Sequence, residues 1–522
     1  MSTRQIPFCV QEPIIGPSDD GLHGILNATI VKWTPVLSCS VEYPATNFES
    51  ALEDIIKHPE YNSSIILRAD ILSDSTSLGD LPLSIHGFLP VRHLKRRIMP
   101  RRPDRDGSLE QDCVFFASGS AAQESIVALV PRLEPGVTLP FYHPDVSAIA
   151  FQYQTLPSDD GQCDHTLTVC VVLPLGFSGT SDHLTPTSRL YRICTSLAES
   201  IWRIGYGKMT GYQKKVEHDV ILDRNEYQDF YLFMRERHKS IVQDWQLDTD
   251  PLKHVFEDIG IATFIILLWK HSYPLIERGF NDPCPSDEPW ALWGRPPGGY
   301  VDLGCGNGLL THILVSMGYT DGIGVDLRAR KTWDDFPPST RNRLQVIAID
   351  PTSISSSETL PAYLSRPNGF LIGNHSDELT PWLPILATLS KSSYLSIPCC
   401  PWALDTKFSK PKGFHKREKT PAEEVLEKKL EARGTGGSKS LYATYLAWHH
   451  REGVMCGFDV ETEVLRIPSS RNWAIVGRKR FNDSTEANVK YQTYALSEIT
   501  HVRDRGIFKT RVPEGKVGSG HR

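Results

Sequence analysis

Three glycines separated by single residues form the clearest chemical signal in this chain. In the segment VDLGCGNGLL, Asp302 ends a strand-like run, and Gly304, Gly306 and Gly308 follow before a helix-like run begins. Glycines in a strand-to-helix turn let the backbone approach a bound molecule closely, with the positive end of the helix behind it. The spacing predicts a ligand-binding turn. A glycine-rich turn that binds nothing is the competing interpretation.

The acids at the ends of three strand-like runs indicate which ligand the turn would hold. A dinucleotide-binding turn has the spacing G-x-G-x-x-G, and here Leu309 occupies the position of the last glycine. Asp302 would repel a pyrophosphate but attract an ammonium group. Asp326 ends the next run, where a ribose contact is expected, and Asp350 ends LQVIAID, within reach of an adenine amino group. These acids favour S-adenosylmethionine over NAD.

A second polar group follows the buried strand-like run GFLIGN, which ends at residue 374. The polar residues there are Asn374, His375, Ser376, Asp377 and Glu378, and a helix-like pattern begins near Pro381. In an open α/β sheet, ligands bind beyond the carboxyl ends of the strands, so these side chains are expected to face a cleft. Helix capping by Ser376 or Asp377 is the alternative.

A basic run, VRHLKRRIMPRRPDRDG, occupies positions 91–107 and holds seven Lys or Arg against two Asp. Arginine-rich loops contact nucleic-acid backbones, although such a run is often only a solvated face. The candidate phosphate-binding residues in this run are Arg96, Arg97, Arg101 and Arg102.

The cysteines give little support for a metal site. There are 11, an odd number with irregular spacing, which is typical of reduced thiols and not of a disulfide framework. Cys399 and Cys400 are adjacent and cannot easily serve one tetrahedral zinc ion, and no C-x-x-C pair lies near them. We therefore expect no metal.

The order of strand-like and helix-like runs indicates how these residues are positioned. From residue 300 onward, strand-like runs alternate with helix-like runs, which predicts a parallel, doubly wound sheet. The runs VETEVLRIPSS and NWAIVGRKR are expected to add an antiparallel pair. The predicted α/β fold has a β-rich α+β region at 1–215, a helical bridge packed on the sheet at 216–280, the sheet domain at 281–480 with a basic insertion at 407–440, and a weakly patterned tail at 481–522.

Composition excludes some classes of protein. The formal charge is −6 and the isoelectric point is near 6.3, so nucleic-acid binding would need local basic patches. The longest apolar run, IGIATFIILLW at 259–269, is shorter than the roughly 20 residues of a membrane-spanning helix, and the N-terminus lacks a secretory pattern. We expect no membrane and no DNA among the partners.

Several segments together resemble the tRNA (uracil-2′-O-)-methyltransferase family, which modifies uridine 44 of serine tRNA. They are, in chain order, TDPLKHVFEDIGIATFIILLW, VDLGCGNGLLTHIL, GVDLRARKTW, LIGNHSDELTPWLP, SIPCCPW and LRIPSSRN. The resemblance covers about 200–480 well and the N-terminal region thinly. In the last block this chain has Ser470 where the family has threonine, so a hydroxyl is kept.

The resemblance implies a Rossmann-like, class I methyltransferase domain with a mixed seven-stranded sheet. It also implies a cytoplasmic enzyme that transfers a methyl group from S-adenosylmethionine to a ribose 2′-hydroxyl of tRNA. A partner protein is neither required nor excluded by the residues. The alternatives are a methyltransferase with another RNA or a small molecule as acceptor, and a non-catalytic tRNA-binding scaffold.

Within this resemblance, the residues after GFLIGN would face the acceptor hydroxyl. Asp377 and His375 are the candidate bases for its proton, with Asn374 beside them. The candidate contacts to tRNA phosphates near the same rim are Lys407, Arg466 and Arg471, for which simple solvation is the alternative.

Overall fold

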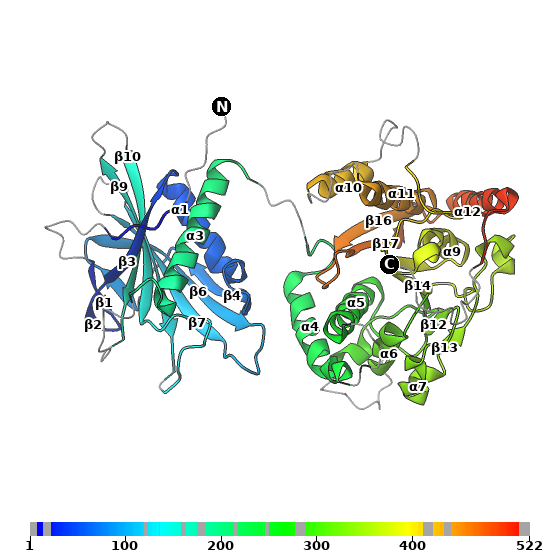
Figure 1. Cartoon of the computed structure of the whole chain (residues 1–522), viewed down its shortest axis with the longest axis horizontal. Helices are drawn as coiled ribbons and strands as arrows, with labels where there is room; N and C mark the ends of the chain where they lie inside the picture. The colour runs from blue at the N-terminus through cyan, green and yellow to red at the C-terminus, as the bar shows by residue number, and fades with distance from the viewer. Residues whose placement is uncertain are drawn as a thin grey trace. The chain divides into compact units, whose positions relative to one another are not determined.

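The computed structural model describes residues 8–13, 22–118, 124–134, 136–157, 163–174, 184–212, 218–243, 245, 250–276, 288–410, 421–432 and 440–510. The chain forms two compact units that divide between residues 213 and 214 (Figure 1). The helices that the sequence assigned to a bridge therefore belong to the second unit.

The first unit is built on a seven-stranded antiparallel sheet with the strand order β3-β10-β9-β8-β7-β6-β4. Its strands are β3 (Thr34–Val41), β4 (Ile66–Ser75), β6 (Phe88–Pro100), β7 (Leu109–Ser118), β8 (Ser125–Arg132), β9 (Ala148–Pro157) and β10 (Cys163–Val172). A three-stranded sheet contains β1 (His23–Leu26), β2 (Thr29–Lys32) and β5 (Leu83–Ile85). The helices are α1 (Ala45–Lys57), the 3₁₀ turn η1 (Pro59–Tyr61) and α3 (Arg189–Met209). This confirms the β-rich α+β prediction.

Helices α1 and α3 pack on one face of the large sheet and share its core. The buried residues of α1 recur every three or four positions, as an amphipathic helix requires. They are Phe48, Ala51, Leu52, Ile55 and Ile56. Helix α3 passes so close to the β3–α1 connection that a β-carbon at Gly205 would lie 2.4 Å from Cζ of Tyr43. A second cluster around Trp33 and Phe116 covers the other face, so the sheet is packed on both sides.

The basic run at 91–107 is largely a strand, β6, and not the loop that its composition suggested. Alternate side chains of a strand point to opposite faces, so part of the run faces inward. Arg96 is 4% exposed, and its guanidinium donates hydrogen bonds to Oε1 of Gln111 at 2.6 Å and to the carbonyl of Ile56 at 2.6 Å. The prediction that Arg96 contacts RNA is therefore wrong.

The second unit contains the predicted mixed seven-stranded sheet, in the order β13-β12-β11-β14-β15-β17-β16. The first five strands of this order are parallel, and β17 runs antiparallel to both β15 and β16. The strands are β11 (Tyr300–Leu303), β12 (Ile323–Asp326), β13 (Leu344–Val346), β14 (Phe370–Asn374), β15 (Ser393–Ile397), β16 (Phe458–Val464) and β17 (Trp473–Arg480). The order reverses beside β11, so the glycine turn lies where open α/β sheets bind ligands.

Helices cover both faces of this sheet (Figure 1). The helices are α4 (Arg224–His238), α5 (Pro251–Ser272), α6 (Leu309–Ser316), α7 (Thr332–Asp335), α8 (Pro338–Arg341), α9 (Leu383–Leu389), α10 (Pro421–Ala432), α11 (Leu441–Met455) and α12 (Thr485–Arg505). The 3₁₀ turns are η2 (Lys239–Val242), η3 (Pro289–Leu292), η4 (Pro351–Ser353), η5 (Ser357–Thr359) and η6 (Asp377–Trp382).

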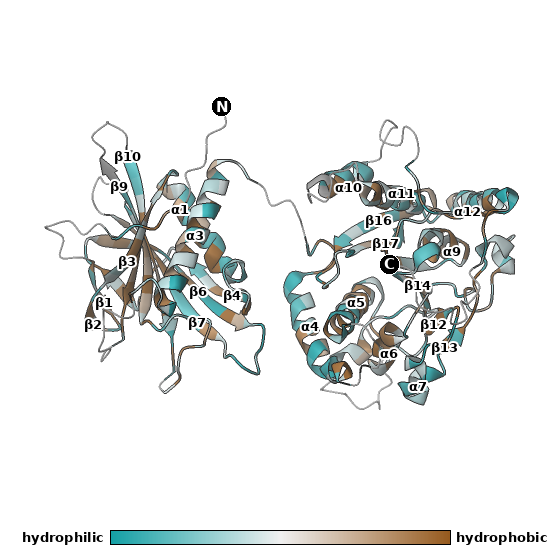
Figure 2. Cartoon of the chain, viewed as in Figure 1, coloured by the Kyte–Doolittle hydropathy of each residue, from teal (hydrophilic) through white to brown (hydrophobic). Residues whose placement is uncertain are grey.

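Helix α5 is buried almost all round over its second half, because it lies between the sheet and helices α4 and α6. It begins at Pro251, and the Asp250 side chain accepts the backbone N–H of Leu252 at 3.0 Å as an N-cap. Figure 2 shows the contrast between the hydrophilic α4 and the more apolar α5. Neither α5 nor any other helix in the described ranges is long and apolar enough to cross a membrane.

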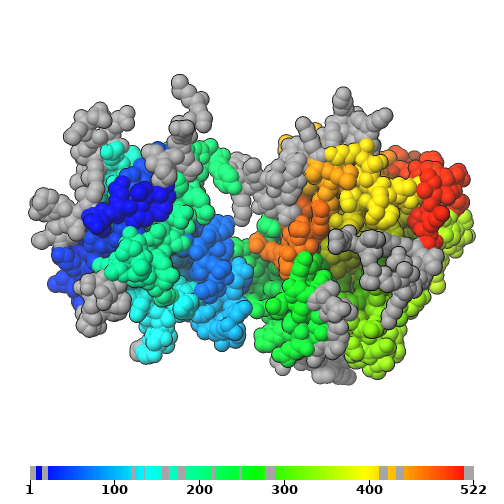
Figure 3. All heavy atoms as spheres, in the orientation of Figure 1, coloured from blue at the N-terminus to red at the C-terminus, as the bar shows by residue number. Residues whose placement is uncertain are grey.

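The C-terminal region is not merely a tail. Helix α12 packs on α9 and buries Ala495, Ile499 and Val502 in the core of the second unit. In Figure 3 it lies as a red segment on the surface of this unit. Of the basic insertion at 407–440, residues 411–420 and 433–439 lie outside the described residues, and α10 occupies much of the rest.

The second unit has a tightly bonded entry segment. The buried carboxylate of Glu463 accepts the backbone N–H groups of Asp219, Val220 and Ile221 at 3.0, 2.6 and 2.9 Å. Arg466 forms an ion pair with the side chain of Asp219, with Nε 2.9 Å from Oδ1. The start of the unit is therefore fixed to the end of β16 and the connection that follows it.

Candidate active site

The glycine turn connects β11 to α6 with three left-handed residues. The φ angles of Gly304, Gly306 and Gly308 are +75°, +53° and +80°, a region that other residues rarely adopt. A β-carbon at Gly306 would meet no atom within 4 Å, whereas one at Gly308 would lie 2.8 Å from Cδ1 of Leu344. Gly304 and Gly306 line a cavity, and Gly308 caps α6 and packs against β13.

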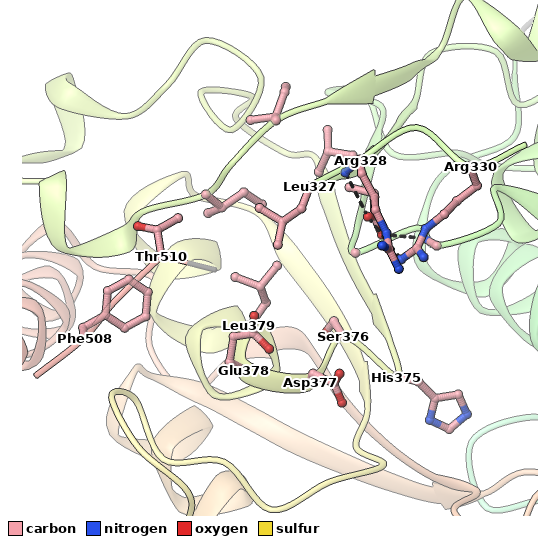
Figure 4. A pocket seen from close by; sticks show the side chains of 16 residues that line it. Leu327, Arg328, Arg330, His375, Ser376, Asp377, Glu378, Leu379, Phe508 and Thr510 are labelled. Atoms are coloured by element: carbon pink, nitrogen blue, oxygen red, sulfur yellow. Dashed lines mark hydrogen bonds and ion pairs between the residues drawn. The ribbon is translucent and has the colours of Figure 1, made fainter. Parts of the chain in front are cut away.

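Asp326 lies at the end of β12, as the sequence predicted, and its carboxylate faces the turn. Oδ2 accepts the backbone N–H of Gly306 at 2.9 Å, and Oδ1 lies 3.5 Å from Nη2 of Arg330. A cavity of about 400 Å³ begins here and runs along the carboxyl edge of the sheet (Figure 4). Its apolar lining residues are Val325, Leu327, Ile347, Ile349, Leu379 and Phe508.

Asp350 does not lie in this cavity. Strand β13 pairs with β12 from Leu344 to Val346 and then ends. The prediction that Asp350 ends a strand is therefore wrong. The exposed carboxylate of Asp350 caps the turn η4 and accepts the backbone N–H and hydroxyl of Thr352 at 2.9 and 2.6 Å. Ile347 and Ile349 of the same segment line the cavity instead.

A second cavity of about 420 Å³ adjoins the first through Gly304, Gly306 and His375, which line both. It contains three carboxylates, together with Lys253, Arg471 and two histidines. The residues that line it are Lys253, His254, Glu257, Asp258, Asp302, Gly304, Cys305, Gly306, Asn307, Leu310, Asn374, His375, Cys399, Ser469 and Arg471. The two cavities form one cleft with an apolar end and an acidic end.

The carboxylates of the acidic end repel one another. Asp302 is 1% exposed and accepts a hydrogen bond from Oγ1 of Thr311 at 2.9 Å, yet burial raises its pKa to about 7. Burial, together with the nearby charges of Asp302 and Glu257, raises the pKa of Asp258 to about 8. Asn374 donates a hydrogen bond from Nδ2 to Oδ1 of Asp258 at 3.2 Å. Such a site favours a cationic ligand, because a positive charge would relieve the repulsion.

S-Adenosylmethionine, the ligand that the sequence predicted, has the matching charge distribution. Its sulfonium and ammonium groups are cationic, and its adenine is flat and largely apolar. The acidic end of the cleft therefore fits the methionine part, and the apolar end beyond Asp326 fits adenine. Glu257 and Asp258 were missed as site residues, because α5 was interpreted as a packing helix. The available signal was an acidic pair inside an otherwise apolar run, HVFEDIGIATF.

The polar residues after β14 adopt an unusual backbone conformation. The φ angles of His375 and Asp377 are +54° and +47°, and left-handed non-glycine residues often occur at functional sites. Nε2 of His375 lies 3.1 Å from Oε1 of Glu257 on α5. Ser376, not Asp377, is the N-cap of η6, and it makes no side-chain capping bond. Capping therefore does not explain Asp377, whose side chain lies on the cavity wall (Figure 4).

The three cationic residues predicted near the rim are not equivalent. Arg471 lines the acidic cavity, and its guanidinium lies 3.9 Å from the ring centre of Tyr442. Nζ of Lys407 lies 3.6 Å from the ring centre of Trp402. Arg466 is paired with an acid in the entry segment. Neither Lys407 nor Arg466 lines either cavity.

In the first unit, the other three predicted phosphate contacts, Arg97, Arg101 and Arg102, are exposed. Nη2 of Arg97 lies 2.6 Å from Oε1 of Glu110, which neutralises much of its charge. Arg101 donates from Nε to the carbonyl of Ile66 at 3.2 Å, and Arg102 lies in the exposed turn after β6.

One further cluster lies beside the cleft. A carboxylate oxygen of Asp377 and the sulfur atoms of Cys399 and Cys400 lie within 4.8 Å of one another, and Sγ of Cys399 is 3.4 Å from Oδ1 of Asp377. The cluster offers three ligand atoms, one fewer than a closed structural zinc site uses. The expectation of no metal stays a prediction.

Two family models match the chain, one in each unit. The model described as "TRM44-like, N-terminal bet v1-like domain" matches residues 16–215. The model described as "Predicted AdoMet-dependent methyltransferase" matches residues 221–284 and 293–351, which include α5, the glycine turn and Asp326.

Curated relatives match both units together. The tRNA (uracil-O(2)-)-methyltransferase of Neurospora crassa is 33% identical over 496 residues, which cover 88% of each chain. The Schizosaccharomyces pombe protein of the same name is 32% identical over 90% of this chain and 89% of its own. The Saccharomyces cerevisiae protein is 28% identical over 84% of this chain and 85% of its own. The chain belongs to the tRNA (uracil-O(2)-)-methyltransferase family, a group of S-adenosylmethionine-dependent methyltransferases.

Proposed function

We propose that this protein transfers the methyl group of S-adenosylmethionine to the 2′-hydroxyl of a uridine in tRNA. The observation that carries the proposal is the continuous cleft at the carboxyl edge of the sheet, which joins an apolar end, a glycine turn and an acidic end. Relatives that bear the name of this activity align with most of the chain. We further propose that the target is uridine 44 of serine tRNA and that the enzyme acts in the cytoplasm.

In this proposal the chain orients the donor by charge. Asp302 and Asp258 attract the methionine end, and Gly304 and Gly306 leave room for it. Asp326 accepts hydrogen bonds from the ribose hydroxyls at the junction of the two cavities. The donor supplies an electrophilic methyl group bonded to a positively charged sulfur.

The residues after β14 would act on the acceptor hydroxyl. Alignment of the hydroxyl with the methyl group can supply about 7–11 kcal/mol of the barrier reduction in favourable systems, so a strong base is not required. Asp377 and His375 are the proposed bases, and both line the cleft. Glu257 would orient the His375 ring through the 3.1 Å contact at Nε2. Asn374 would hold Asp258 in position.

Cationic side chains would hold the tRNA backbone. Arg471 is the leading residue for this role because it lines the second cavity together with Asn374 and His375, so its charge would attract a phosphate beside the target ribose. Arg97, Arg101 and Arg102 are proposed as weaker contacts in the first unit, since all three are exposed. Lys407 and Arg466 are retained as outer contacts.

The direct test is methyl incorporation. Bulk tRNA from a strain that lacks the gene would be incubated with the protein and labelled S-adenosylmethionine, and the modified nucleotide would be mapped. We expect one 2′-O-methyluridine, in serine tRNA, and no label in tRNA from the parent strain, where the site is already methylated. Donor binding without label in tRNA would contradict the proposed acceptor, and absence of donor binding would favour a scaffold.

A further inference from the structure

The chain after α12 forms one wall of the cleft. Phe508 and Thr510 line the cavity that contains Asp326, although they lie more than 180 positions further along the chain. Figure 4 shows both residues on the far side of the cavity from Arg328 and Arg330. Resting on the proposed function above, we propose that Phe508 and Thr510 form the adenine-binding wall of the donor site, with the ring of Phe508 as its main contact.

The helix end directs this segment back towards the cleft. Gly506 follows α12 with a left-handed φ of +63°, and its N–H donates to the carbonyl of Arg503 at 3.0 Å. This is a common way to end a helix and turn the chain. A β-carbon at Gly506 would meet nothing within 4 Å, so the turn depends on backbone conformation and not on crowding.

Arg503, Arg505 and Phe508 hold the end of α12 and the segment that follows it in place. Arg503 donates from Nε to the carbonyl of Thr352 at 2.7 Å and from Nη2 to the carbonyl of Ile354 at 2.6 Å. Arg505 lies 2.9 Å from the mostly buried carboxylate of Asp405.

The third contact is aromatic. The ring of Phe508 meets the buried indole of Trp382 edge to face, with 5.8 Å between the ring centres. A wall held at three points can present a ring to a ligand without being ordered anew on binding, which lowers the cost of association.

The chemistry of the surrounding wall matches adenine. Ile347, Ile349, Leu327 and Leu379 provide an apolar surface in the same cavity, and Phe508 is the one phenyl, phenol or indole ring among its described lining residues. Aromatic rings bind nucleobases by stacking, with no requirement for a particular base. Asp350, the residue first expected to contact adenine, lies outside this cavity, and Phe508 takes its place.

Substitution in the full-length chain tests the proposal. Phe508→Ala should weaken binding of S-adenosylhomocysteine roughly 5- to 100-fold in calorimetry, because one base–ring stacking contact is lost. Phe508→Trp should retain the affinity. The matched control is Ile507→Ala, because that neighbouring side chain is 51% exposed and does not line the cavity. A Phe508→Ala protein that binds as tightly as the wild type would overturn the proposal.

Hydrogen exchange provides a test that needs no substitution. S-Adenosylhomocysteine should slow amide exchange in residues 506–510 of the wild-type chain, while exchange in α1 of the first unit should not change. Binding with unchanged exchange at 506–510 would refute the adenine-wall assignment and leave the proposed function intact. If the wild-type chain binds neither the donor nor its product, the proposed function itself fails.

Discussion

Donor binding should be coupled to proton release, because the carboxyl groups of Asp258 and Asp302 are partly protonated before the donor binds. With pKa values of about 8 for Asp258 and about 7 for Asp302, about nine-tenths of the first carboxyl and about half of the second carry a proton at pH 7. The cationic sulfonium and ammonium groups favour the ionised forms. We therefore expect up to about 1.4 protons to be released for each S-adenosylmethionine bound at pH 7.

The assay is calorimetry in two buffers with different ionisation enthalpies, such as phosphate and Tris. The apparent binding enthalpies should differ in proportion to the number of protons released. At pH 9 the difference should nearly vanish, since most of the Asp258 population is then ionised before binding. Below pH 7 the affinity should fall as pH falls, because binding must then displace up to two protons.

Two variants and one ligand test whether the released protons come from the carboxyl groups of the cleft. Asp258→Asn should reduce proton release at pH 7 to about half a proton, which is the share of Asp302. Asp350→Asn should behave as the wild type, because this exposed carboxylate lies outside the cleft. S-Adenosylhomocysteine lacks the sulfonium charge and should release fewer protons than the donor. Equal enthalpies in both buffers at pH 7 would refute the reasoning.

Three further predictions concern stability, tRNA binding and metals. Because the folded-state pKa of Asp258 is raised from 3.8 to about 8, its stabilising effect is complete below 3.8 and is lost as pH rises through 8. Asp258→Asn should therefore raise the Tm of the free chain at pH 8 more than at pH 5, and a larger gain at pH 5 would contradict this sign. Binding of tRNA should weaken steeply with salt, and Arg471→Gln should lower the log–log slope by about 0.7–0.9, the value for one phosphate; the exposed Lys490→Gln is the control. Finally, elemental analysis should find no stoichiometric zinc, and Cys400→Ser should leave donor binding unchanged; a bound zinc ion lost in that variant would show that Asp377 and the two cysteines form a metal site.

The sequence predicts those parts of the cleft whose residues are adjacent in the chain. It does not predict the parts where residues far apart in the chain meet. The glycine turn and Asp326 could be identified because a strand end, its turn and the following helix are adjacent in the chain. Asp258 could not, because it meets Asn374 across 116 positions and only the packing of α5 on the sheet joins them. A helix that is apolar on all sides gives no periodicity from which to infer the direction of its few polar residues.

Two predictions are wrong because a sequence pattern does not match the element that the segment forms. The run LQVIAID is apolar to its end, but β13 is an edge strand and stops pairing at Val346. In the basic run, composition indicated a loop, whereas the alternation along β6 buries Arg96 beneath its exposed neighbour Arg97. Helix α12 is hard to find from the sequence because only three of its 21 residues are buried, although these three recur at the spacing of one helix face.

The bonded entry segment of the second unit has a mechanical consequence. Glu463 and Arg466 fix the start of this unit, and Ser469 and Arg471, a few residues further along the same connection, line the acidic cavity. A pull on the preceding chain therefore enters the second unit at the base of the loop that borders the cleft. The connection that anchors the start of the unit is thus the same one that carries Ser469 and Arg471 to the cleft.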